Sequence, residues 1–250
     1  MIELNICHLY PDLLNTYGDR GNILALQRRA EWHGINASIT NITIGDNFDA
    51  SAFDLIFLGG GQDYEQEIIQ TDVLEQKGAE IKNAIAGMKV FLCICGGYQL
   101  MGKYYKTWDG KEIEFLGALD LWTVGGKERM IGNIVFESDS ISDPEGGPLK
   151  IVGFENHSGR TYLGEGISPL GKVLTGNGNN GSDGYEGAVY NNVYCSYSHG
   201  SLLPKNPLLT DHLISLALKQ KYSEFEGLGQ LDDAFENAAR NSVMQRILKK

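Results

Sequence analysis

The chain has 250 residues, 42% hydrophobic and 21% charged, a composition that is typical of globular proteins and excludes intrinsic disorder. Its formal net charge of −11 repels phosphate backbones, so we expect no nucleic-acid partner. The longest apolar run, residues 90–95, is far shorter than the ~20 residues of a membrane-spanning helix, so we expect no transmembrane segment.

The four cysteines do not indicate a disulfide framework. Cys7, Cys93, Cys95 and Cys195 form no Cys-x-x-Cys pair, and no basic residue precedes the apolar stretch at the N-terminus, unlike in a secretory signal. Reduced thiols are typical of the cytoplasm, which is the predicted location.

Strand-like and helix-like segments alternate through the first hundred residues. Strands are predicted at 2–9, 35–44, 54–58 and 89–94, and helices at 22–33, 65–88 (one long helix, or two divided at Gly78) and 96–103. This order is typical of a parallel sheet with right-handed crossovers and helices on both faces.

The pattern changes after residue 113. Short β-like pieces are predicted at 130–136, 149–154, 172–175 and 185–197, with 176–187 forming exposed glycine-rich turns. Helices return at 207–220 and 231–248. We predict one α/β domain over residues 1–250, with a central, mostly parallel sheet flanked by helices. Its core spans about 2–220, and a helical extension spans about 229–250.

The segment 90–99 carries the strongest functional signal. A buried strand ends at Cys95, and two glycines begin the next helix, which is the strand–turn–helix layout of a nucleophile elbow. The N-terminus of a helix favours a thiolate. Cys95 is therefore the predicted nucleophile, whereas Cys93, two residues earlier on the strand, is interpreted as a buried, inert cysteine.

A thiolate nucleophile needs a base that also protonates the leaving group, and histidine suits both tasks near pH 7. His33 and His212 fall within amphipathic helices and are interpreted as structural. His8 ends the first strand, and for His157 a binding and a structural role are equally open. His199 ends an apolar strand, where open α/β sheets assemble their sites, and is the predicted base.

A third signal is the triple glycine at 59–61, which follows another buried strand. Attack on an amide builds negative charge on its oxygen, and exposed backbone N–H groups stabilise that charge. Phosphate binding is the lesser interpretation, because no Gly-Lys-Ser/Thr follows the run as it does in a P-loop.

Together these segments resemble the class I (triad-type) glutamine amidotransferases, and among them the cobyric acid synthase branch. The resemblance is carried by the glycine-rich turn, Cys-Gly-Gly-Tyr-Gln at 95–99 and a Tyr-x-His-Gly strand end at 197–200. Segments 15–22, 59–66, 153–157 and 196–200 are similar, more narrowly, to the amidotransferase subunits of lipid II isoglutaminyl synthases. The similar segments run from about residue 8 to about residue 206, and they imply a flavodoxin-like core.

The resemblance implies a reaction. Cys95 would attack the side-chain amide of L-glutamine, and His199 would deliver a proton to the departing ammonia. Water would then release glutamate from a γ-glutamyl thioester.

The resemblance also implies substrate-binding positions. Backbone N–H groups near Gly60, Gly61 and Gly96 would form the oxyanion hole. Gln99 would lie near bound glutamine, and Arg129 would hold its carboxylate through a bidentate fork. For Arg129, a solvated surface charge is the competing interpretation.

A partner is implied as well. Ammonia would pass to a separate Mur ligase-like subunit of a heterodimer, in which ATP, with Mg²⁺, activates D-glutamate in the stem peptide of lipid II. We expect no cofactor and no metal site in this chain, which has no ATP-binding signature.

One position departs from the family pattern. Many class I amidotransferases have an acid two residues after the histidine, where this chain has Ser201. The resemblance therefore leaves the group that orients His199 unidentified. Our hypothesis is that the partner supplies a carboxylate, which would make the isolated chain a poor glutaminase.

Three other functions remain open. Amidation of a corrin precursor would require an ATP-using synthetase domain. A non-catalytic amidotransferase-like interaction module is the second, and loss of Cys95 or His199 would have favoured it. The third is a cysteine peptidase on a related elbow, which would cleave peptides rather than free glutamine.

Overall fold

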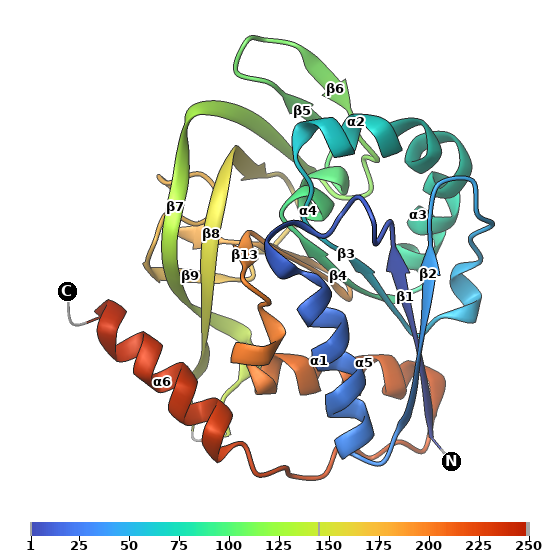
Figure 1. The fold of residues 1–250 in the computed structure, drawn as a ribbon, viewed down its shortest axis with the longest axis vertical. Helices are drawn as coiled ribbons and strands as arrows, with labels where there is room; N and C mark the ends of the chain where they lie inside the picture. Colours follow the sequence, from blue (N-terminus) through green and yellow to red (C-terminus); the bar gives the residue numbers. More distant parts are fainter. Residues whose placement is uncertain (1, 145, 249–250) are drawn as a thin grey trace.

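The structure is a computed structural model that describes residues 2–144 and 146–248. Its main sheet has six strands in the order β11-β12-β4-β3-β1-β2 (Figure 1). The strands are β1 (Glu3–Leu9), β2 (Asn36–Ile42), β3 (Leu55–Leu58), β4 (Val90–Ile94), β11 (Ala188–Tyr190) and β12 (Val193–Ser196). Every neighbouring pair is parallel except β11–β12, so the predicted mostly parallel sheet is confirmed.

The two central strands, β3 and β4, are buried at every position. Continuous apolar runs are expected where helices cover both faces of a parallel sheet. The helices α1 (Arg20–Trp32) and α5 (Pro207–Lys221) pack against each other and against this sheet. Along the sheet, the chain moves one way from β1 to β2 and the opposite way from β3 to β4. Because such crossovers are right-handed, the helices between β3 and β4 lie on the other face of the sheet from α1.

That connection is the segment predicted as one long or broken helix at 65–88. It consists of α2 (Asp63–Thr71), a π-helical segment (Asp72–Lys77) and α3 (Gly78–Ala86), so the predicted division at Gly78 is confirmed. The π-helical segment turns Asp72 and Lys77 into the protein, where they form a buried ion pair. Tyr10 at the end of β1 donates a hydrogen bond of 2.6 Å to Asp72 Oδ2, which ties this segment to the main sheet.

A second, mostly antiparallel sheet stands beside the first (Figure 1). It contains β5 (Tyr104–Lys106), β6 (Glu112–Glu114), β7 (Leu121–Ser142), β8 (Pro148–Leu163), β9 (Gly171–Thr175), β10 (Tyr185–Glu186) and β13 (Ser198–His199). The prediction of short β-like pieces is wrong for β7 and β8, which form one hairpin with strands of 22 and 16 residues.

Glycines lie inside this hairpin without ending its strands, and Gly159 lies beyond the predicted piece 149–154. Gly153 and Gly159 lie inside β8 and not in turns. A Cβ on Gly153 would lie 2.5 Å from Ser198 Cβ, and one on Gly159 would lie 2.4 Å from Gln99 Nε2. These glycines therefore allow close approach between the second sheet and the residues of the active site.

Three other boundaries differ from prediction. The helix after Cys95, α4 (Gly96–Leu100), is shorter than the predicted 96–103. The piece predicted at 185–197 is divided among β10, β11 and β12. The expected exposed turns at 176–187 include five buried residues, Gly178, Asn179, Asn180, Glu186 and Gly187.

The remaining elements are short or peripheral. Three 3₁₀ turns lie at Thr16–Gly18, Ala50–Ala52 and Leu203–Lys205. The terminal helix α6 (Ala234–Leu248) lies across β7, β8 and β9 and buries no residue. Within the described residues, no helix combines the length and the apolar character that a membrane crossing needs.

Candidate active site

Cys95 lies between β4 and α4 in a strained backbone conformation. Its φ of 48° and ψ of −100° fall outside the regions that residues with a side chain normally adopt. The Cys95 N–H donates to Ser196 O (2.8 Å), and Cys95 O accepts from Gln99 N–H (3.0 Å), so both sides of the turn are held. A Cβ on Gly96 would lie 2.6 Å from Gly61 N, which is why a glycine must follow the cysteine. The predicted elbow is present.

His199 is oriented by a carboxylate of the same chain. Its Nδ1 lies 3.3 Å from Asp19 Oδ1, and both side chains are fully buried. Asp19 Oδ2 in turn accepts a 2.6 Å hydrogen bond from Gly60 N–H. Burial alone would lower the pKa of His199, but the interactions with Cys95 and Asp19 outweigh it and raise the pKa to about 10. Asp19 therefore contacts Nδ1 of His199, while Nε2 is buried without a hydrogen-bond partner and Cys95 is close enough to raise the pKa of the imidazole.

Glycine is required at position 60 for His199 and Asp19 to contact each other. A Cβ there would lie 2.6 Å from His199 Cε1 and 2.9 Å from Asp19 Oδ2. The oxyanion-hole prediction requires the Gly60 N–H to be a free donor, but this N–H is already hydrogen-bonded to Asp19. The predicted role of Gly60 in the oxyanion hole is therefore wrong. Gly60 supports the histidine–aspartate pair instead.

Asp19 is a candidate site residue that the sequence did not identify. It lies in the loop between β1 and α1, at the carboxyl edge of the main sheet, and that position was the available signal. Ser201, at the position where the resemblance led us to expect an acid, donates a 2.7 Å hydrogen bond to Gly18 O and so fastens the Asp19 loop. This geometry does not require the carboxylate that we expected from a partner.

A cavity of about 220 Å³ opens beside Cys95. Of the predicted site residues, Cys95, Gly61, Gln99 and Arg129 line it, whereas His199, Gly60 and Gly96 are not among its lining residues. The other lining residues are Thr16, Tyr17, Gln62, Asp63, Tyr64, Tyr105, Asn156, His157, Ser158 and Gly159.

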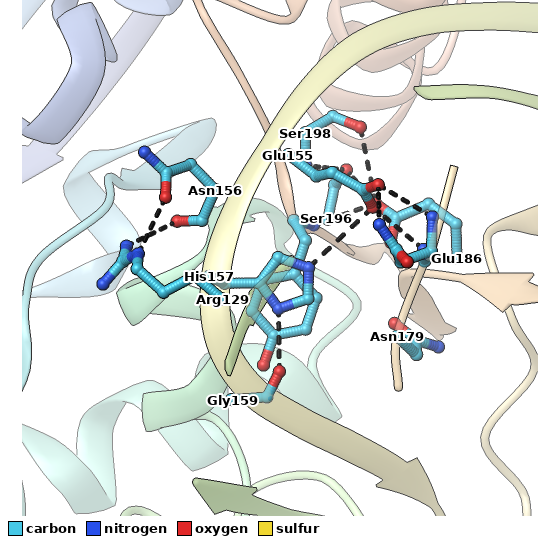
Figure 2. A network of polar contacts seen from close by, with 12 residues as sticks. Arg129, Glu155, Asn156, His157, Gly159, Asn179, Glu186, Ser196 and Ser198 are labelled. Atoms are coloured by element: carbon cyan, nitrogen blue, oxygen red, sulfur yellow. Dashed lines mark hydrogen bonds and ion pairs between the residues drawn. The ribbon is translucent and has the colours of Figure 1, made fainter. Parts of the chain in front are cut away.

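Arg129 is held in place by Asn156, which sequence reasoning also missed. The Arg129 Nε donates to Asn156 Oδ1 (2.9 Å) and Nη2 donates to Asn156 O (3.0 Å). Figure 2 shows these two residues together, on one side of β8. Arg129 is exposed to solvent, and these two hydrogen bonds hold its guanidinium at the cavity wall.

Gln99 belongs to a chain of buried side-chain hydrogen bonds. Its Oε1 accepts from Gln66 Nε2 (2.8 Å), and its Nε2 donates to Tyr197 OH (3.1 Å). Tyr197 OH also shares a 2.6 Å hydrogen bond with Thr161 Oγ1. The Gln99 amide is therefore fixed at the cavity wall by Gln66 of α2 and by Tyr197, which lies between β12 and β13.

His157 lies on the cavity wall as part of a buried polar cluster (Figure 2). Its ring stacks on Tyr197 with centroids 3.7 Å apart, and its Nδ1 donates to Gly159 O (2.7 Å). Glu155 Oε2 lies 4.0 Å from His157 Nε2. Nε2 is buried without a hydrogen-bond partner, and the residue borders the cavity, so both interpretations of His157 stay open.

Glu186 holds the corner that carries His199. Its Oε1 accepts from Ser196 Oγ (2.6 Å) and from Tyr197 N–H (2.8 Å), between β12 and β13. Burial raises the pKa of Glu186 to about 7, against the smaller opposing effect of these donors. Glu186 is thus a buried carboxyl that fixes the backbone just before the base.

The remaining histidines, His8, His33 and His212, do not line the cavity, and the structural interpretation of His33 and His212 is consistent with their contacts. His33 Nε2 lies 3.0 Å from Asp211 Oδ1, and His212 Nε2 lies 2.6 Å from Tyr194 OH. His8 is buried, and its burial lowers its pKa to about 4.

The other cysteines, Cys7, Cys93 and Cys195, are free and fully buried, as expected of inert thiols. In the described parts of the chain, no three His, Cys, Asp or Glu side chains gather as metal ligands.

Sequence comparison gives several relatives. The GatD subunit of lipid II isoglutaminyl synthase (glutamine-hydrolyzing) from Streptococcus pneumoniae is 44% identical over 89% of this chain and 83% of the relative. The corresponding subunit from Staphylococcus aureus is 41% identical over 98% of this chain and 97% of the relative. A probable cobyric acid synthase from Methanosphaera stadtmanae is 30% identical over 80% of this chain and 43% of that protein.

Solved structures share the fold. The structure of PurLQS from Thermotoga maritima gives a TM-score of 0.56 at 17% identity and covers 88% of this chain and 97% of that chain. A glutamine amidotransferase from the same organism gives 0.50 at 18% identity and covers 99% of both chains. Residues 5–207 match the CobB/CobQ-like glutamine amidotransferase domain. The chain therefore belongs to the CobB/CobQ-like family of glutamine amidotransferases, as its motifs predicted.

Proposed function

We propose that this chain hydrolyses L-glutamine through a thioester on Cys95 and passes the ammonia to a Mur ligase-like, ATP-dependent partner. The partner would use it to amidate D-glutamate in the stem peptide of lipid II. The grouping of Cys95, His199 and Asp19 beside a small cavity carries the proposal, because one chain then supplies the nucleophile, the base and the carboxylate that orients the base.

The first half of the reaction forms the thioester. The Cys95 thiolate, which a neighbouring imidazolium stabilises, attacks the amide carbon of glutamine, and the carbonyl electrons move to oxygen. The N–H groups of Gly61 and Gly96 would stabilise this oxyanion. As the tetrahedral intermediate collapses, the C–N bond breaks and His199 gives its proton to the leaving nitrogen, which departs as ammonia.

The second half returns the enzyme to its starting state. His199, now neutral, takes a proton from water as the water oxygen attacks the thioester carbon. The C–S bond breaks, glutamate leaves and the thiolate is restored beside the imidazolium. Asp19 keeps the imidazole in one orientation through both halves, since it contacts the nitrogen that faces away from the reaction.

Substrate selection is assigned to the cavity. Arg129, fixed by Asn156, would pair with the carboxylate of glutamine, and Gln99 would border the substrate. The cavity volume of about 220 Å³ suits one amino acid and is below the range usual for larger ligands, which disfavours the peptidase alternative.

The partner and its substrate are inferred from the relatives. Both GatD relatives match over most of their own length at 41–44% identity, and their name specifies lipid II isoglutaminyl synthase. The cobyric acid synthase match is weaker and covers 43% of that protein, so amidation of a corrin precursor is the less favoured alternative. ATP and Mg²⁺ would bind to the partner.

The test is an ammonia-release assay on this chain co-purified with its Mur ligase-like partner. Wild type is expected to convert glutamine to glutamate, and Cys95→Ala to reduce the rate at least about 1,000-fold. Cys93→Ala is the matched control, since Cys93 is buried on the same strand, and it should keep most of the activity. Activity retained in Cys95→Ala would refute the proposal.

A further inference from the structure

We propose that Tyr17 is a substrate-binding residue whose hydroxyl acts with Arg129 on the carboxylate of glutamine, while its ring covers His199. The proposal rests on the glutaminase function above and adds a determinant of substrate choice to it. It concerns a residue from the loop between β1 and α1, far in sequence from both of its neighbours in the site.

Tyr17 touches both functional ends of the cavity. Its ring meets the imidazole of His199 edge to face, with centroids 5.1 Å apart and planes at 71°. Its hydroxyl lies 3.5 Å from Arg129 Nη2. Tyr17 also lines the cavity together with Cys95. One side chain therefore spans the distance between the base and the cation that would hold the substrate.

The hydrogen bonds of Arg129 leave a defined face for an anion. Nε and one N–H of Nη2 are committed to Asn156, so the N–H groups of Nη1 and the second N–H of Nη2 remain. The hydroxyl of Tyr17 lies at Nη2. A carboxylate on this face comes within reach of that hydroxyl, which then turns from accepting the arginine N–H to donating to the carboxylate oxygen.

The backbone at Tyr17 is fixed in a costly conformation. Its φ is 58° in the left-handed region, where a residue with a side chain rarely lies. The flanking residues are clamped on both sides: Thr16 N–H donates to Gly60 O (3.0 Å), and Gly18 O accepts from Ser201 Oγ (2.7 Å). Strain of this kind persists only where surrounding contacts enforce it, and it is concentrated at functional sites.

The ring also separates the base from solvent. His199 is fully buried, whereas Tyr17, which packs against it, is 45% exposed. The ring therefore has one face toward the imidazole side of the site and another toward water. Excluding water strengthens the interaction of the imidazole with Cys95 and with Asp19.

The test separates these two contributions by substitution. Tyr17→Phe keeps the ring and removes the hydroxyl, so KM for glutamine should rise about 10-fold while kcat stays within about twofold. Tyr17→Ala removes both, so the same rise in KM should come with a fall in kcat of at least about 10-fold. Tyr185→Phe is the control, because Tyr185 is 44% exposed on β10 and does not line the cavity. The KM of this variant for glutamine should equal that of wild type.

A second substrate identifies the group that the hydroxyl recognises. 4-Aminobutanamide has the side-chain amide of glutamine but lacks the α-carboxylate. Tyr17→Phe should leave kcat/KM for it unchanged, so that discrimination between the two substrates falls about 10-fold.

Binding can be measured without turnover. Iodoacetamide should alkylate Cys95, because the other three cysteines are fully buried, and glutamine should protect it. In Tyr17→Phe the protecting concentration should rise about 10-fold. If wild type releases ammonia but Tyr17→Phe has KM and protection within twofold of wild type, the Tyr17 proposal is overturned and the glutaminase function stands. If wild type releases none, the proposed function itself fails.

Discussion

Asp19 reaches His199 across 180 positions of sequence, from the first loop of the main sheet to the last strand of the second. At the scale of single residues, this contact fixes Nδ1 of the imidazole and leaves Nε2 as the nitrogen available for proton transfer. The carboxylate is buried and bonded to a backbone N–H as well, so it has little freedom to adopt another arrangement.

Replacing Asp19 tests this role. Asp19→Asn keeps the size of the side chain but removes the charge and favours the wrong histidine tautomer, so kcat should fall about 100- to 10,000-fold. KM should change little, because Asp19 does not line the cavity. Asp12→Asn, at an exposed position of the same connection, is the control and should retain activity. A kcat within threefold of wild type for Asp19→Asn would show that another group orients His199.

At the scale of elements, Glu186 links β10 to the corner between β12 and β13. A carboxyl whose folded pKa is raised from 4.5 to about 7 stabilises the fold below pH 4.5 and loses that contribution as pH rises through 7. Above pH 7 the ionised Glu186 is a buried negative charge near Glu155. Burial would raise the pKa of Glu155, but hydrogen bonds from His157 and from backbone donors outweigh burial and lower that pKa.

Glu186→Gln should therefore flatten this part of the pH dependence. The amide keeps an acceptor for Ser196 and Tyr197 but cannot ionise, so the loss of stability between pH 5 and pH 8 should be smaller than in wild type. Urea unfolding at pH 5 and at pH 8 measures the difference in the free energy of unfolding. Glu224→Gln, at an exposed position, should leave the wild-type difference intact. Equal differences in wild type and Glu186→Gln would show that Glu186 does not titrate in this window.

The π-helical segment is a second element held by buried charge. Lys77 and Asp72 are 1% and 3% exposed, and Asp72 also accepts hydrogen bonds from Tyr10 and from Gly45 N–H. The pair joins the helical connection to the ends of β1 and β2.

Lys77→Ala would leave the Asp72 carboxylate buried without its cation, so the free energy of unfolding should fall by about 3–5 kcal/mol. Chemical denaturation measures the loss. Lys82→Ala, at an exposed position of α3, is the control and should change stability by no more than about 0.5 kcal/mol. A loss below about 1 kcal/mol for Lys77→Ala would mean that water or another cation compensates for the missing amine.

At the scale of the whole molecule, local patterns predicted the parts that depend on neighbours in sequence. The apolar runs of β3 and β4 and the Cys-Gly-Gly turn indicated a parallel core and an elbow, and both are confirmed. A few adjacent residues are enough to determine a strand that is buried on both faces, and the same is true of a turn that requires glycine.

The rest depends on pairings that no local pattern contains. Asp19 and Asn156 act through His199 and Arg129, which come from other elements, so their roles appear only when the two sheets meet. The β7–β8 hairpin was predicted as fragments because its glycines resemble turn signals. Gly159 instead permits close approach to Gln99, a cause that lies outside its own strand.

The central claim, that Cys95 carries the γ-glutamyl group, can be tested directly with 6-diazo-5-oxo-L-norleucine, a glutamine analogue that alkylates the nucleophile. Peptide mass spectrometry of the complex after treatment should find a single adduct on Cys95, formed in step with loss of glutaminase activity and slowed by excess glutamine. His199→Asn should form the adduct much more slowly. An adduct on Cys93, or full inactivation with Cys95 unmodified, would contradict the account.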